Sequence, residues 1–205
     1  MPVKDGREYR TIGGESFRAI DDGQGSCIVE GYATTFDVPY DFGFDGMKEC
    51  IDRHALDGAD MSDVIFQYDH EGRVLARQRN NTLSVMCDDH GLLVRADLKG
   101  SEQGRQLYEE IRNGLVDRMS WAFIVDANGW EYDRQTRTST IKKISKVFDV
   151  SAVSIPANDD TEIHARSYFD GVIEAEQQEL LQREKEGEAR RRYAAALSMA
   201  KVKGM

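Results

Sequence analysis

Cysteine is scarce in this chain of 205 residues, and long apolar runs are missing altogether. The three cysteines, Cys27, Cys50 and Cys87, are an odd number without a C-x-x-C pair. We therefore expect reduced, buried thiols and no structural zinc site. No apolar run reaches the ~18 residues that a membrane-spanning helix needs. The opening MPVKDGREYR lacks the apolar region of a signal peptide, so none is expected.

An excess of positive charge is also missing. Lys and Arg number 27 against 37 Asp and Glu, which gives a net charge of −10 and a pI near 4.9. This balance argues against electrostatic binding of DNA or RNA. The 40% of hydrophobic residues suits a globular protein, whereas the 31% of charged residues is high because many lie beyond residue 170.

Short runs of β-forming residues fill most of the chain up to residue 165. The turn formers DDHG at 88–91 separate two alternating runs, which is a hairpin signal. Many short strands at this spacing favour a barrel over a doubly wound sheet. The segment 47–56 is expected to be a short strand that leads into a helical turn. The other expected strands cover residues 8–12, 16–20, 27–36, 63–70, 73–78, 81–89, 91–98, 119–125, 130–133, 138–144 and 148–155.

One helix is expected among the strands, over residues 101–114 (SEQGRQLYEEIRNG). Ser101 can cap its first turn, and Gly114 can end it. Leu107, Ile111 and Leu115 fall on one face at helical spacing, so that face is expected to pack on the core.

The composition changes after residue 169. The segment EAEQQELLQREKEGEARRRYAAALSMAKVKG contains good helix formers but few apolar residues, and no heptad repeat continues beyond Ile173 and Leu180. We expect a domain over residues 1–169 and a charged helical or disordered tail over 170–205. A tail that binds a scaffold or another partner is the functional alternative.

Among the four histidines, His70 has the most suggestive position. The apolar run VIFQYDH leads directly to it, and a residue at the end of a core strand can be held rigidly at a cleft, as a general base requires. On spacing alone, a strand-end histidine that simply meets solvent is the favoured alternative. His90 lies in the predicted hairpin turn, His54 in the segment DRHAL, and His164 after the last strand.

Two polar residues interrupt apolar strands. Ser120 stands between Met119 and Trp121, and a nucleophilic serine there would need a base and a group that orients that base. Asp149 stands inside the run VFDVSAVSI, where a charge is costly unless it is paired. A serine bonded to the backbone and an outward-facing aspartate are the structural alternatives.

A metal site is a further alternative. His70, Asp69, His90, Asp88 and Asp89 could meet on adjacent strands, but their spacing matches no H-E-x-x-H or similar motif. The sequence also lacks a phosphate-binding G-x-x-x-x-G-K-[ST], a dinucleotide fingerprint and a G-x-S-x-G elbow. The spacing of these residues alone does not identify the functional site.

Several segments, taken in order, resemble the phage prohead (capsid) maturation proteases. They are VEGYATTFD, the strand that ends in His70, NTLSVMCDDHGLLVRADL, GRQLYEEIRNGLVDRMSWAF and DVSAVSIPAND. The resemblance as a whole covers about residues 8–165. This family is similar in fold to the herpesvirus assembly proteases (assemblins). The resemblance therefore implies a mainly β, α+β protein with a β-barrel core of the herpesvirus-protease type and inserted helices.

The resemblance also implies the roles of three residues. Ser120 falls on the family's nucleophile, His70 on its general base and Asp149 on the acidic third member that orients the imidazole. Asp69 and Asp117 are the nearby carboxylates that could take the third role instead. Backbone N–H groups near Ser120 or at Asn158 are candidates for the oxyanion hole.

The implied function is a serine endopeptidase of phage procapsid maturation. Its expected substrates and partners are the scaffold region of the major capsid protein, other procapsid proteins and the protease itself, inside the procapsid in the host bacterial cytoplasm. No metal or organic cofactor, nucleic acid or membrane is expected, and a homodimer is possible. A catalytically silent assembly or scaffold protein and a metal-dependent hydrolase are the alternatives.

Overall fold

The computed structural model describes residues 6–13, 17–23, 25–41, 46–154, 175, 178–179 and 181–191. The chain divides into two compact units, residues 1–162 and 163–205. The predicted boundary between residues 169 and 170 lies outside the described residues and stays a prediction.

The largest sheet has five strands in the order β1-β10-β13-β6-β7. Neighbours are antiparallel except β13 and β6, which run parallel. Valine, isoleucine and aromatic residues fill β10 and β13, as is typical of strands that are buried on both faces. The strands are β1 (Glu8–Gly13), β10 (Arg118–Val125), β13 (Ile144–Val153), β6 (Ile65–Tyr68) and β7 (Glu71–Arg77).

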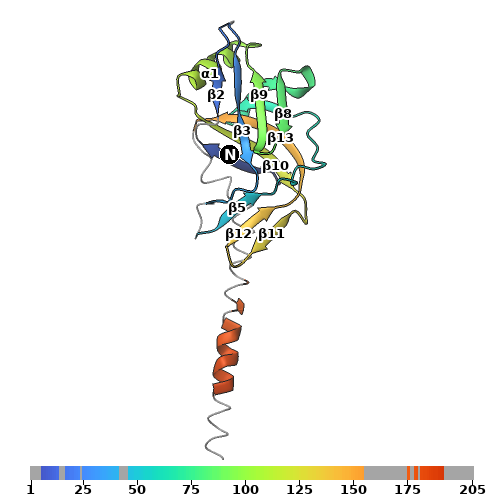
Figure 1. The fold of residues 1–205 in the computed structure, drawn as a ribbon, viewed down its shortest axis with the longest axis vertical. Coiled ribbons are helices and arrows are strands. Elements are labelled where there is room, and N and C mark those ends of the chain that lie inside the picture. The colour runs from blue at the N-terminus through green and yellow to red at the C-terminus, as the bar shows by residue number, and fades with distance from the viewer. Residues whose placement is uncertain are drawn as a thin grey trace, which may run out of the picture. The chain divides into compact units, whose positions relative to one another are not determined.

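Two four-stranded sheets complete the first unit, in the orders β2-β3-β9-β8 and β11-β12-β5-β4. Figure 1 shows β3, β9 and β8 side by side, with α1 next to β2. The predicted hairpin at residues 88–91 is confirmed, since β8 and β9 pair across it. The strands are β2 (Arg18–Ile20), β3 (Ile28–Thr35), β9 (Gly91–Asp97), β8 (Leu83–Cys87), β11 (Trp130–Asp133), β12 (Thr138–Ile141), β5 (Lys48–Ile51) and β4 (Tyr40–Asp41).

The mainly β, α+β class is confirmed, but the described strands form three sheets and no closed barrel. Each sheet keeps two edges: β1 and β7, β2 and β8, and β11 and β4. Several edge strands are very short; β4 has 2 residues and β2 has 3. Strands of that length cannot supply the continuous ladder that closes a barrel.

The predicted helix forms as α1 (Glu102–Arg112). Ser101 caps it, because its Oγ accepts a hydrogen bond from the Gly104 N–H at 3.0 Å. Leu107 and Ile111 are buried, as their spacing predicts. Gly104 lets the first turn approach the residue that follows β9, since a Cβ there would lie 2.1 Å from the Leu98 carbonyl oxygen.

The predicted role of Gly114 at the other end of α1 is confirmed. The helix ends at Arg112, and Gly114 follows the C-cap residue Asn113 in a left-handed conformation with φ +72°. This residue reverses the chain direction before Leu115, which is 74% exposed. The expectation that Leu115 packs with the helix face was wrong.

The core lies between the sheets and α1. Trp121, Phe66 and Phe123 are among its largest fully buried side chains, and the rings of Trp121 and Phe123 stack at 4.0 Å. Cys50 is buried and Cys27 half-buried, whereas Cys87 is exposed, so the prediction of buried thiols was wrong for Cys87. All three thiols are free.

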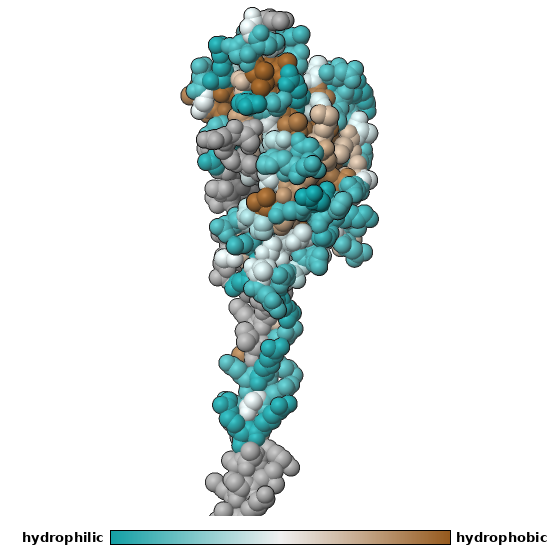
Figure 2. Space-filling model, viewed as in Figure 1, coloured by the Kyte–Doolittle hydropathy of each residue, from teal (hydrophilic) through white to brown (hydrophobic). Residues whose placement is uncertain are grey.

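In the second unit, residues 181–191 are helical and almost entirely exposed. Figure 2 shows this helix as a predominantly hydrophilic surface. The helical form that the charged sequence predicts is thus present in the part of the tail that the structure describes. None of the helices among the described residues has the length and hydropathy of a membrane span.

A buried ion pair joins β1 to β5. The Arg10 guanidinium donates two hydrogen bonds to the Glu49 carboxylate, at 2.5 and 2.7 Å, and a third to Glu8 at 3.1 Å. The Tyr40 hydroxyl also donates to Glu49. Burial opposes the charge on Arg10, but the Glu49 carboxylate outweighs it, so the pKa of Arg10 lies above its ordinary value. Such a pair is stable only while both partners are present.

We expect Glu49→Ala to lower the free energy of unfolding by about 3–5 kcal/mol, because Arg10 is then left buried without its main partner. Urea unfolding at neutral pH measures the loss. The control is Arg18→Ala, which removes the exposed pair with Glu30 (3.4 Å); it is expected to cost less than about 1 kcal/mol. Equal losses in the two variants would contradict a structural role for the buried pair.

Acid should destabilise the fold below about pH 4, near the ordinary pKa of an aspartate in an unfolded chain. The Lys146 ammonium lowers the pKa of Asp60, and the Gly91 N–H with the Tyr32 hydroxyl lowers that of Asp88. A lowered folded-state pKa contributes stability above the unfolded value, and this contribution is lost as the pH falls through the folded one. Tm measured from pH 7 to pH 2 should fall mainly below pH 4, and less steeply in Asp60→Asn. An equally steep fall in that variant would contradict the assignment.

Candidate active site

The pairing of β10 with β13 places a serine and a carboxylate on one face of the five-stranded sheet. Ser120 lies opposite Ser151, and Ala122 lies opposite Asp149. Directly opposed residues project from the same face, and so do residues two apart on one strand. Ser120 is therefore on the same face as Asp149. Both are buried, Ser120 completely.

The hairpin between β6 and β7 supplies the histidine. Asp69 and His70 form its turn, with φ values of 50° and 56°, a left-handed pair typical of two-residue hairpin turns. The Asp69 carboxylate accepts hydrogen bonds from the N–H and the hydroxyl of Ser154, both at 2.9 Å. The Asp69 N–H donates to the Ala152 carbonyl oxygen at 2.9 Å. These bonds tie the turn to the end of β13.

The structure brings the three predicted residues together. The His70 Nδ1 lies 2.5 Å from Asp149 Oδ1, and its Nε2 lies 2.7 Å from Ser120 Oγ. The side chains of His70 and Asp149 are only 3% and 5% exposed. Little water therefore screens these contacts, which strengthens the electrostatic interaction between them.

Two further residues contact the predicted three, and the sequence did not single them out. The Ser151 hydroxyl donates to Asp149 Oδ1 at 3.1 Å, and the Tyr9 ring packs edge-on against the His70 ring, with centroids 4.8 Å apart. Ser151 could have been found from its place two residues after Asp149 on a strand. Tyr9 carries no comparable signal, because it meets His70 only through the pairing of β1 with β10.

The other carboxylates considered for the third position have different partners. Asp69 binds Ser154, and the Asp117 side chain is 70% exposed with its nearest charge contact at Arg118, 3.7 Å away. The carboxylate that bonds the His70 imidazole is Asp149.

The remaining histidines lie elsewhere. His54 is exposed, and its Nδ1 lies 3.0 Å from the Asp57 carboxylate. His90, in the β8–β9 turn, packs against the Tyr32 ring on β3. His164 and the candidate oxyanion residue Asn158 lie outside the described residues. Within the described parts of the chain, no group of three or more His, Cys, Asp and Glu residues could hold a metal ion. The set proposed from Asp69, His70 and residues 88–90 is therefore not assembled.

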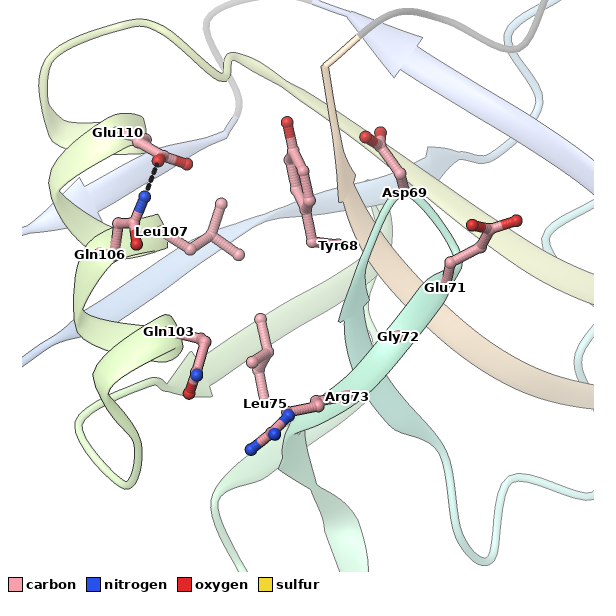
Figure 3. A pocket seen from close by; sticks show the side chains of 10 residues that line it. All are labelled: Tyr68, Asp69, Glu71, Gly72, Arg73, Leu75, Gln103, Gln106, Leu107 and Glu110. Carbon is pink, nitrogen blue, oxygen red and sulfur yellow. Dashed lines mark hydrogen bonds between the residues drawn. The ribbon is translucent and has the colours of Figure 1, made fainter.

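Two grooves flank the hairpin that carries His70. One, of about 540 Å³, lies between the hairpin and α1, and Figure 3 shows Tyr68, Leu75 and Leu107 pointing into it. The other, of about 580 Å³, is lined by His70 and Asp149 among others. Ser120 is not among the described residues that line either groove.

Charged groups border both grooves. Glu71 lines the two of them, Arg73 and Glu110 border the one in Figure 3, and Arg7 borders the one beside His70. Burial and the Asp149 charge raise the pKa of the nearby Tyr9 phenol, while Arg7 acts in the opposite direction. The Tyr9 side chain is therefore neutral at physiological pH.

A family model described as caudovirus prohead serine protease (Peptidase_S78) matches residues 16–172. The chain belongs to this family. The protease family predicted from the sequence is thereby confirmed, and so is its class as a serine peptidase.

A solved structure is also similar to this protease, that of the bacteriophage T4 capsid assembly protease, gp21. The two chains are 14% identical, and the match covers 73% of this chain and 96% of that one, with a TM-score of 0.47. No curated protein sequence matches the chain significantly.

We expect Asp69→Val to destabilise the protease by about 1–2 kcal/mol, because a β-branched residue is strained at φ +50° and cannot bond Ser154. The same variant should lose activity through displacement of His70. Asp69→Asn is the control, since asparagine tolerates this conformation and keeps an acceptor oxygen. Thermal unfolding and peptidase assays compare the two. If Val and Asn behave alike, the turn conformation does not constrain the site.

Proposed function

We propose that the protein is a serine endopeptidase with Ser120 as nucleophile, His70 as general base and Asp149 as the residue that orients and stabilises the imidazole. The observation that carries this proposal is the single His70 ring, which bonds Ser120 Oγ with one nitrogen and Asp149 with the other. Nucleophile, base and orienting carboxylate in this sequence of contacts are the arrangement that nucleophilic hydrolysis of amides requires.

In the first half of the reaction, Ser120 Oγ attacks the carbonyl carbon of the scissile peptide bond. His70 Nε2 takes the hydroxyl proton, and the Asp149 carboxylate, which accepts the Nδ1 hydrogen, stabilises the imidazolium that forms. His70 then gives this proton to the leaving amine as the C–N bond breaks. The product is an ester between Ser120 and the acyl half of the substrate.

The second half repeats these steps with water. His70 Nε2 removes a proton from water, the hydroxide oxygen attacks the acyl carbon, and the proton returns to Ser120 Oγ when the ester bond breaks. Ser120 is fully buried, so a peptide carbonyl reaches Oγ only if the groups over it move when substrate binds. Backbone N–H groups near Ser120 are the candidates for binding the oxyanion.

The substrates we propose are procapsid proteins: the scaffold region of the major capsid protein, other internal proteins and the protease itself. The family description, prohead serine protease, supports this class of substrate. The place of action is then the interior of the procapsid in the host bacterial cytoplasm, with the capsid precursor as the main partner. A homodimer remains compatible with this proposal.

We expect Ser120→Ala to abolish cleavage of the capsid precursor and Asp149→Asn to lower the rate by about 10³–10⁴-fold, since the amide favours the wrong imidazole tautomer. Intact-mass spectrometry of each variant mixed with the precursor, followed over time, measures the fragments. Asp117→Asn is the matched control and should cut at the wild-type rate.

A serine-directed fluorophosphonate tests the nucleophile without a known substrate. Attack by Ser120 Oγ on phosphorus expels fluoride and leaves one phosphonyl group on the protein. Wild type should gain this mass, and Ser120→Ala should not. Labelling of both proteins, or activity that a chelator removes while Ser120→Ala retains it, would exclude the serine mechanism. A folded wild type that neither labels nor cuts would instead favour a silent assembly protein.

A further inference from the structure

Strand β1 lies directly beside the strand that carries the nucleophile. Thr11 is opposite Ser120, and Tyr9 is opposite Ala122. Tyr9 therefore projects from the same face of the sheet as Ser120 and Asp149. The family match begins at residue 16, so β1 lies outside the matched region.

Tyr9 contacts the base on a side that the hydrogen bonds leave free. Bonds at both nitrogens fix the ends of the His70 ring, but the ring can still tilt about the line that joins them. The Tyr9 ring meets it nearly perpendicularly, at 79° with centroids 4.8 Å apart, and Tyr9 is only 7% exposed. An edge-to-face contact of this kind is favourable and restricts the tilt.

The opposite face of β1 holds Tyr9 in place. Arg10 projects away from the site, where it forms the buried pair with Glu49. The same guanidinium donates a hydrogen bond to the Tyr9 carbonyl oxygen at 2.8 Å. The backbone at Tyr9 is thus fixed by a buried charge on one side, while its ring lies against His70 on the other.

We propose that Tyr9 is a positioning residue, which keeps the His70 imidazole in the orientation that serves Ser120 and Asp149 together. This inference rests on the proposed function of His70. It makes β1 a part of the catalytic apparatus of this chain, although the strand contributes no group to the reaction itself. The aromatic ring of Tyr9, and not its hydroxyl, restricts the orientation of the imidazole.

The test compares Tyr9→Leu with Tyr9→Phe in the full-length protein. We expect Tyr9→Leu to lower kcat about tenfold with KM changed less than about twofold, because a misoriented base affects the chemical step and leaves binding intact. Tyr9→Phe keeps the ring and should keep kcat within about twofold. The rate of fluorophosphonate labelling should follow the same order, whatever the natural substrate is.

A second tyrosine–histidine contact supplies the control. The Tyr32 ring on β3 and the His90 ring in the β8–β9 turn have centroids 4.5 Å apart at 71°, and neither residue is one of the proposed catalytic three. Tyr32→Leu removes a contact of the same kind and should leave kcat and the labelling rate unchanged. Thermal unfolding of all variants shows whether a loss of stability accompanies a loss of rate.

Proton NMR provides a readout that does not depend on activity. A proton shared between His70 Nδ1 and Asp149 should give a downfield signal in wild type and in Tyr9→Phe. We expect this signal to broaden or shift upfield in Tyr9→Leu. Tyr9→Met serves as a second flexible replacement if Tyr9→Leu does not fold.

Three outcomes would overturn the inference: a folded Tyr9→Leu with wild-type kcat and NMR signal, an equal loss in Tyr9→Phe, or an equal loss in Tyr32→Leu. Failure of the proposed function looks different. In that case Ser120→Ala would cut or be labelled like wild type, whatever residue stands at position 9.

Discussion

Both nitrogens of the His70 imidazole are engaged, one with Asp149 and one with Ser120, and this double contact dictates how the central sheet is arranged. The imidazole must reach the nucleophile with one nitrogen and the acid with the other. The strand order β10-β13-β6 allows this, because the strand that carries Asp149 lies between the strand that carries Ser120 and the hairpin that carries His70. The antiparallel register with β10 then brings Ser120 and Asp149 to the same face, and the parallel register with β6 brings the hairpin end close to Ser151.

The backbone strain of this arrangement lies in the turn between β6 and β7. Asp69 and His70 both adopt left-handed backbone conformations, which disfavour non-glycine residues by roughly 1–2 kcal/mol each. Side-chain contacts offset the cost, since Asp69 binds Ser154 and His70 binds its two partners. Strain that surrounding bonds hold in place is common at functional sites, where it fixes a side chain that would otherwise choose a relaxed position. The aspartate before His70 is therefore part of the support of the site.

Local patterns in the sequence were sufficient for the helix, the hairpin at residues 88–91 and most strands, because alternation and capping act over a few residues. They were also sufficient to single out His70, Ser120 and Asp149 as unusual, although only the resemblance linked the three.

Leu115 shows where such reasoning fails: its spacing fits the helix face, but the glycine before it ends the helix. Sheet closure depends on which distant edges meet, and the barrel expected from strand spacing does not form among the described residues. The contact between Tyr9 and His70 could not be predicted from the sequence either, because it arises from the pairing of β1 with β10, two strands far apart in the chain.

The order of the strands along the chain has a consequence for biosynthesis. β13 is the last strand that the structure describes, yet it occupies the middle of the five-stranded sheet. His70 is separated from Ser120 by 50 residues and from Asp149 by 79. Contacts at such separations form late, after the loops between them have closed. A ribosome-bound chain that has not yet released β13 holds Ser120 and His70 without the strand that carries Asp149. The three residues can therefore come together only after β13 has left the ribosome.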